Sequence, residues 1–175
     1  MRIFAKNFRG YRWIEIDLDK ISFLIGDNST GKSSILYLCE AVCREDLHNA
    51  PELNEDFGVS RYDYFSPYFN FDDVTFGFFS KKNIGKNYGK VITVRKGSGI
   101  APVIVRCTHW TEETVVTIRD NRGQAELREM EGRPVDDLRD LLKLHEGAGG
   151  GWRKVEIFER SLGEPSALIM ATIKS

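Results

Sequence analysis

Apolar and polar residues alternate with a period of two near the start of the chain, from Ile14 to Leu18. This period is typical of a strand with one buried face. The segment from Arg2 to Asn7 is predicted to be its hairpin partner, with Arg9 to Tyr11 at the turn. The run from Ile21 to Ile25 is almost continuously apolar, which predicts a strand that is buried on both faces.

The spacing of apolar residues becomes helical after this run. A helix is predicted from about Lys32 to Asp46, because its apolar side chains fall on one face. Asn49 and Pro51 mark its end. The apolar positions of this helix are Ile35, Leu38, Cys39, Val42 and Cys43.

An antiparallel meander is predicted for the middle of the chain, where short apolar runs are separated by turn residues. Before it lies an irregular, aromatic-rich insert at 51–90, with one strand expected at 74–79. After it come a short helix and two further strand candidates. The meander strands are expected at 90–95, 102–107, 114–119 and 125–128, the helix at 134–145, and the last strands at 155–158 and 167–173.

Composition is that of an ordinary globular domain. The 175 residues are 41% hydrophobic and 29% charged, with a net charge of −1, so a real core is expected and no overall basic excess favours nucleic acid. The apolar runs are too short to cross a bilayer, and the N-terminus reads as a strand rather than a signal peptide. The cysteines show no CxxC spacing, which argues against a disulfide scaffold or zinc site. We therefore expect a cytoplasmic protein without a membrane partner. The cysteines are Cys39, Cys43 and Cys107.

The strongest functional signal is a match to the P-loop pattern G-x-x-x-x-G-K-S/T at every fixed position. It lies between a predicted strand and a predicted helix, as the mechanism requires. The glycines let the backbone wrap closely around a polyphosphate, and the amides at the helix N-terminus attract the anion. The matching residues are Gly26, Asp27, Asn28, Ser29, Thr30, Gly31, Lys32 and Ser33.

Three side chains of this loop have expected roles in binding ATP with Mg²⁺. Lys32 is expected to reach the β- and γ-phosphates and to act as the catalytic cation. The Ser33 hydroxyl is expected to ligate Mg²⁺, and Ser34 to add a hydroxyl near the α-phosphate. Because the loop reads phosphates and not the base, the sequence leaves the choice between ATP and GTP open.

The residues on either side of this loop resemble a known family. Lys6-Asn-Phe-Arg-Gly-Tyr11, a strand, and then Ile25 to Leu36 are similar to the start of the SMC/RecF-like ABC ATPases. Asn28 in the third place of the loop is typical of that group. Within it, the chain most resembles OLD-type and related AAA ATPases of bacterial DNA repair and phage defence. The likeness covers residues 2 to about 45 and implies an α/β P-loop NTPase head, with the 90–128 meander compatible with its antiparallel β-subdomain.

The resemblance also implies how such a protein works. Two heads would sandwich ATP, so a homodimer or higher oligomer is expected to control DNA or a nuclease effector. By the same likeness Arg9 approaches the nucleotide, although a solvated turn arginine is an equal alternative. Gln124 is interpreted as a turn or strand residue rather than the family's Q-loop glutamine. Asp72 and Asp73 lie closer to the expected position of the Q-loop and could take the place of its glutamine, but they are more simply interpreted as capping or solvated acids of a loop.

Other parts of an ATPase are missing from the sequence. No apolar strand ends in Asp-Glu, and no Leu-Ser-Gly-Gly signature is present. His48, His109 and His145 are interpreted as surface or loop residues. We therefore expect these residues to be the N-terminal part of a longer ATPase, binding nucleotide weakly and hydrolysing little alone.

Two alternatives stay open at this point. A nucleotide or small-molecule kinase would place an arginine-rich lid after the core, whereas residues 51–90 contain one arginine, Arg61. A nucleotide-sensing module that never hydrolyses would also lack the catalytic acids. DNA binding is supported only by the basic stretch at 81–90, which is more simply a solvated surface.

Overall fold

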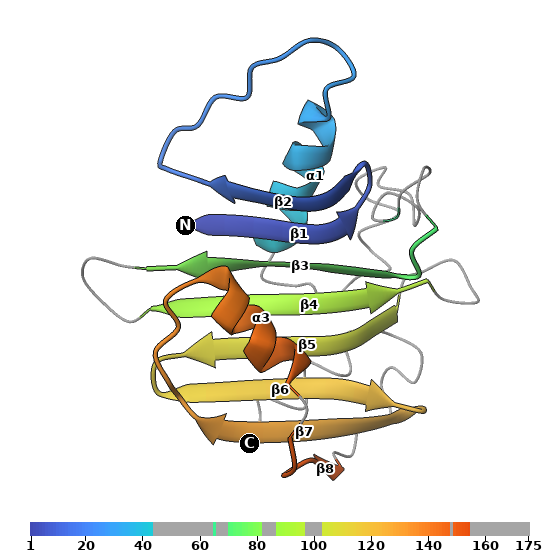
Figure 1. Cartoon of the computed structure of the whole chain (residues 1–175), viewed down its shortest axis with the longest axis vertical. Helices are drawn as coiled ribbons and strands as arrows, with labels where there is room; N and C mark the ends of the chain where they lie inside the picture. The colour runs from blue at the N-terminus through green and yellow to red at the C-terminus, as the bar shows by residue number, and fades with distance from the viewer. Residues whose placement is uncertain (44–64, 66–69, 82–86, 97–102, 148, 155–175) are drawn as a thin grey trace.

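One antiparallel sheet organises the protein in the computed structural model, which describes residues 1–43, 65, 70–81, 87–96, 103–147 and 149–154. The strand order is β2-β1-β3-β4-β5-β6-β7-β8 (Figure 1). Two helices are found within the described residues, α1 (Lys32–Cys43) and α3 (Leu138–Glu146). The strands are β1 (Arg2–Phe8), β2 (Tyr11–Asp17), β3 (Asp73–Ser80), β4 (Tyr88–Arg95), β5 (Val103–Thr111), β6 (Thr114–Asn121), β7 (Gln124–Glu131) and β8 (Arg153–Lys154).

The two helices cover opposite faces of this sheet, α3 in front and α1 behind in Figure 1. Neighbouring residues of a strand point to opposite faces, so each strand contributes to two cores. On β1, Ile3 and Ala5 pack with Leu38 of α1, whereas Phe4 packs with Leu141 of α3. The result is a three-layer arrangement of helix, sheet and helix, in which β1 contributes side chains to the apolar clusters on both faces.

Most of the predicted elements are confirmed. The N-terminal hairpin is β1 and β2, the predicted meander is β4 to β7, and the two predicted helices are α1 and α3. The strand predicted at 74–79 is β3, and β4 begins two residues before the predicted strand at 90–95. The predicted strands at 155–158 and 167–173, and the last turn of the first helix, lie outside the described residues.

The turn between β6 and β7 shows why the meander could be predicted. Arg122 and Gly123 both have positive φ angles, 55° and 81°, as two-residue hairpin turns require. The Gly123 amide donates to the Asp120 side chain at 2.8 Å. Gln124 pairs with Asn121 at the start of β7, so its interpretation as a hairpin residue is confirmed.

The predicted buried strand at Ile21 to Ile25 is wrong. This stretch has no strand conformation, and Ile21, Phe23 and Ile25 are 75%, 84% and 94% exposed. A strand buried on both faces needs hydrogen-bonded neighbouring strands as well as elements packed on its two faces. In the described part of the chain every strand pairing is antiparallel, and none of them involves residues 21–25. The apolar run therefore follows the edge strand β2 without entering the sheet, and the parallel pairing of an α/β sheet is not found among the described residues.

His145 was interpreted as a surface or loop residue, and this is also wrong, because it is buried on α3. Its side chain is 2% exposed on the inner side of α3. Nε2 lies 2.8 Å from the Thr93 hydroxyl, and Nδ1 lies 2.9 Å from the Thr108 hydroxyl. Burial, followed by the charge of Arg106, lowers the pKa of His145 to about 3. The imidazole is therefore a neutral bridge between strands β4 and β5 and the helix above them.

No helix among the described residues combines the length and apolar character needed to cross a membrane.

Candidate functional site

The predicted phosphate loop forms a tight turn directly before α1. Ser29 and Gly31 have φ angles of 67° and 91°, in the left-handed region that glycine adopts without strain. The Tyr11 hydroxyl of the neighbouring hairpin occupies the place that a Cβ at position 31 would take. Both the backbone angle and the close approach of Tyr11 therefore require glycine at position 31.

Replacement of Gly31 by alanine is expected to lower the free energy of unfolding by about 1–2 kcal/mol, the usual cost of a left-handed non-glycine residue. Tyr11 must also move aside, which disturbs the hairpin contact with the loop. Gly10→Ala is the matched control, because a Cβ there meets nothing within 4 Å. Urea unfolding of the two variants measures the difference, and equal stabilities would contradict the described loop conformation.

The N-terminus of α1 presents free backbone donors beside this turn. The first helical hydrogen bond runs from the Ile35 amide to the Gly31 carbonyl at 3.1 Å. The amides of residues 32–34 precede it and have no acceptor within the helix. Among the described residues no side chain caps them either. Such a helix end attracts anions, because unpaired N–H groups and the helix dipole act together.

A cavity of about 530 Å³ opens onto these donors, within the usual size range of small-molecule sites. Its walls come from two elements, the β1–β2 hairpin turn and the loop with the first turn of α1. Gly26 and Asp27 do not line it, but their carbonyls accept hydrogen bonds from Lys32. The lining residues are Arg9, Gly10, Tyr11, Asn28, Ser29, Thr30, Gly31, Lys32, Ser33 and Ser34.

The Lys32 side chain lies across its own loop. Its ammonium donates to the Gly26 carbonyl at 2.6 Å and also to the Asp27 carbonyl. Thr30 supports the same turn, since its hydroxyl donates to the Asp27 carbonyl at 2.8 Å. Because these groups are exposed, water can replace the ammonium at the carbonyls. Lys32 is therefore held at the loop by bonds that a stronger anionic acceptor can outcompete.

Arg9 reaches the same cavity from the hairpin turn, where its φ angle is 51°. Its guanidinium lies over the Tyr37 ring of α1, 4.7 Å from the ring centroid. One nitrogen, Nη1, is buried and has no hydrogen-bond acceptor among the residues that the structure describes. This arrangement differs from a solvated turn arginine, because a buried donor without an acceptor costs free energy that a bound anion would recover.

Tyr11 is a cavity residue that the sequence did not reveal. Its hydroxyl donates to the Thr30 carbonyl at 3.4 Å and lies against Gly31. The hairpin turn thereby contacts the loop directly, across a sequence separation of 19 residues. The one available signal was its position two residues after Arg9 in the predicted turn.

The acids considered as Q-loop substitutes lie away from this cavity. Asp73 accepts a hydrogen bond from Arg95 Nε at 2.9 Å on the neighbouring strand. The Asp72 carbonyl accepts from the Lys96 amide at 3.0 Å, which closes the end of the β3–β4 pair. Both therefore have structural partners, and neither they nor Gln124 line the P-loop cavity.

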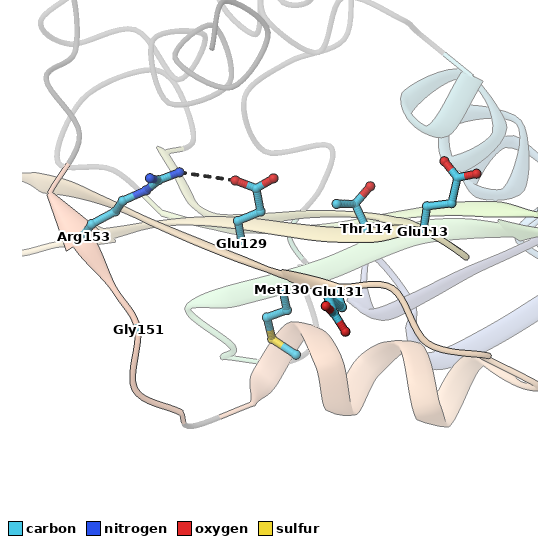
Figure 2. A pocket seen from close by; sticks show the side chains of 7 residues that line it. All are labelled: Glu113, Thr114, Glu129, Met130, Glu131, Gly151 and Arg153. Carbon is cyan, nitrogen blue, oxygen red and sulfur yellow. Dashed lines mark hydrogen bonds and ion pairs between the residues drawn. The ribbon is translucent and has the colours of Figure 1, made fainter.

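A second cavity, at the far edge of the sheet, has the wrong charge for a polyphosphate (Figure 2). Glu113, Glu129 and Glu131 line it with Arg153, which donates to Glu129 at 3.3 Å. Carboxylates repel anions, so this site is unsuited to a nucleotide tail. Within the described residues no cluster of side chains has the composition of a metal site.

The loop and the uncapped helix end together define a P-loop nucleotide-binding protein. A family model described as the AAA ATPase domain matches residues 1–141. The chain therefore belongs to the AAA ATPase domain family, which supports nucleotide binding and ATPase chemistry in general. Comparison with curated proteins and with solved structures gave no match.

Proposed function

We propose that this protein binds ATP with Mg²⁺ at the loop of residues 26–34 and serves as the head of an SMC/RecF-like ATPase of the OLD type. The observation that carries the nucleotide site is the uncapped N-terminus of α1 facing a cavity of about 530 Å³. The finer family assignment is supported by Asn28 and by the Asn7-Phe8-Arg9 segment. The antiparallel sheet is compatible with the β-subdomain of such heads.

The residues of the site suit this ligand. Lys32 would exchange the carbonyls of Gly26 and Asp27 for phosphate oxygens, which accept stronger, charge-assisted hydrogen bonds. Arg9 would donate its unpaired Nη1 to the same polyphosphate. Ser33 would hold Mg²⁺ through its hydroxyl, and Ser34 would bond near the α-phosphate. Mg²⁺, when bound, neutralises charge on the phosphates.

Hydrolysis needs a further group. The described residues that line the cavity include no carboxylate to orient water. In the proposed head, residues outside this cavity would supply the acid, and a second head would supply the signature motif. ATP-driven pairing of heads would then control DNA or a nuclease effector in repair or defence.

The proposal is tested by comparing nucleotides with different tails. The intact protein is titrated calorimetrically with ATP, ADP and AMP in the presence of Mg²⁺. A site built around phosphate donors is expected to bind AMP at least about 10-fold more weakly than ATP, because AMP forgoes the charge-assisted bonds of the lost phosphates. Absence of ATP binding, or equal affinity for AMP, would refute the assignment.

A nucleotide-sensing module is the second candidate, and the missing carboxylate at the cavity is the observation that favours it. Both functions bind ATP, but only an ATPase releases phosphate. Phosphate release by the intact protein, measured with excess ATP and Mg²⁺, separates the two. A bound but unchanged nucleotide would favour the sensing module.

A further inference from the structure

Arg9 and Tyr37 meet although 28 positions separate them in the sequence. Arg9 belongs to the β1–β2 turn, and Tyr37 lies on α1 one turn beyond the phosphate loop. The carbon at the centre of the guanidinium is 4.7 Å from the centroid of the tyrosine ring. This distance is within the range in which an aromatic face attracts a cation.

We propose that Tyr37 is a positioning residue for Arg9, holding its guanidinium at the wall of the nucleotide cavity so that its N–H groups face phosphate oxygens. This inference rests on the proposed function, since it names how that site places its second cation. Tyr37 itself does not line the cavity, whereas Arg9 does. Its effect on binding would therefore pass through Arg9.

The contact with the Tyr37 ring leaves the hydrogen-bond donors of Arg9 available. A guanidinium is planar, and its N–H groups point outward in that plane. An aromatic ring takes up the face of the group and accepts none of these in-plane hydrogen bonds. Within the described part of the chain Nη1 is buried without an acceptor, which is the condition expected of a donor that awaits an anionic partner.

Tyr37 is suited to this role because its own position is fixed. The ring is partly buried and packs against the apolar cluster between α1 and the sheet. Its hydroxyl makes no hydrogen bond within the described residues, so the ring alone holds the arginine. The same hairpin turn is attached a second time by Tyr11, which bonds to Thr30. Helix, loop and hairpin thus form one unit around the cavity.

The test compares ATP affinity in the intact protein, with Mg²⁺, for four variants. Tyr37→Leu keeps apolar volume but removes the ring, and is expected to weaken binding about 3- to 10-fold, the range of a partly desolvated cation–π contact. Tyr37→Phe keeps the ring and is expected to stay within about 2-fold of wild type. Arg9→Ala is expected to weaken binding about 10-fold or more. Arg9→Ala combined with Tyr37→Leu is expected to bind no worse than Arg9→Ala, because the two residues act as one.

Val42→Ala is the matched control for loss of packing. Val42 is buried in the same apolar cluster of α1 and does not line the cavity. It is expected to lower stability and leave ATP affinity unchanged. Three results would overturn this inference and leave the proposed function standing. They are wild-type affinity in Tyr37→Leu, a loss of affinity in Tyr37→Phe, and additive losses in the double variant. Failure of wild type to discriminate ATP from AMP would overturn the proposed function and this inference with it.

Discussion

Replacing Lys32 with alanine is expected to weaken ATP binding by about 10- to 100-fold, the range given by one or two hydrogen bonds to a charged group. In the structure the ammonium is held at the loop by the carbonyls of Gly26 and Asp27. A polyphosphate would offer the ammonium negatively charged oxygens in place of the two carbonyl dipoles. Removal of the ammonium leaves the phosphates with backbone donors only.

This prediction has a close control in the same protein. Lys20 is an exposed lysine of the segment that leads to the loop, and it does not line the cavity. Lys20→Ala makes the same change in net charge and is expected to leave ATP affinity within about 2-fold, as for a screened surface charge. Calorimetric titration of both variants with ATP and Mg²⁺ measures the difference. Equal affinities in Lys32→Ala and Lys20→Ala would remove Lys32 from the site.

The phosphate loop could be predicted because its chemistry is local. Glycines at fixed positions, a lysine and a helix start lie within ten residues, and in the structure Ser29 and Gly31 adopt positive φ angles directly before α1. The hairpins of the meander were predictable for the same reason. Turn residues such as Arg122 and Gly123 determine the register of the strands that they join.

The segment from Ile21 to Ile25 shows where sequence patterns stop being sufficient. An apolar run indicates that a segment favours burial, but burial requires neighbouring elements that distant parts of a chain supply. In the described residues β2 forms one edge of the sheet, and the run beyond it has no strand beside it. A contiguous exposed apolar stretch of this kind is typical of surfaces that contact other protein segments.

Two contacts at the cavity were equally invisible in the sequence. Tyr37 was not among the predicted apolar positions of the helix, and nothing in the sequence indicates that Arg9 lies over its ring. Tyr11 follows a turn, and its contact with Gly31 depends on how the hairpin packs against the loop. Both contacts join segments brought together only by the tertiary fold. They make the hairpin part of the site, which the motif alone does not include.

His145 could have been placed correctly from the sequence. It is four residues after Leu141 and seven after Leu138, so helical spacing puts it on the apolar face of α3. The polarity of the imidazole favoured a surface position instead. The structure resolves the conflict by giving both ring nitrogens hydroxyl partners, from Thr93 and Thr108, so a polar side chain is accommodated inside the core.

The buried imidazole is expected to make the protein sensitive to mild acid. The pKa of His145 is lowered from 6.5 to about 3 in the folded protein, so below pH 6.5 the unfolded chain takes up a proton that the folded chain does not. The free energy of unfolding is therefore expected to fall as the pH falls through this window, by up to about 1.4 kcal/mol for each pH unit. Urea unfolding between pH 7 and pH 5 measures this slope.

Two variants separate His145 from the other titrating groups. In His145→Gln an amide replaces the imidazole and does not titrate, so the slope between pH 6.5 and pH 5 is expected to flatten even if the variant is less stable throughout. Asp17 has its pKa lowered by the Arg2 hydrogen bond, and such a carboxylate loses its contribution only at more acidic pH. Asp17→Asn is therefore expected to keep the wild-type slope in this window. Parallel curves for wild type and His145→Gln would mean that the imidazole is not the group that destabilises the sheet and α3 in acid.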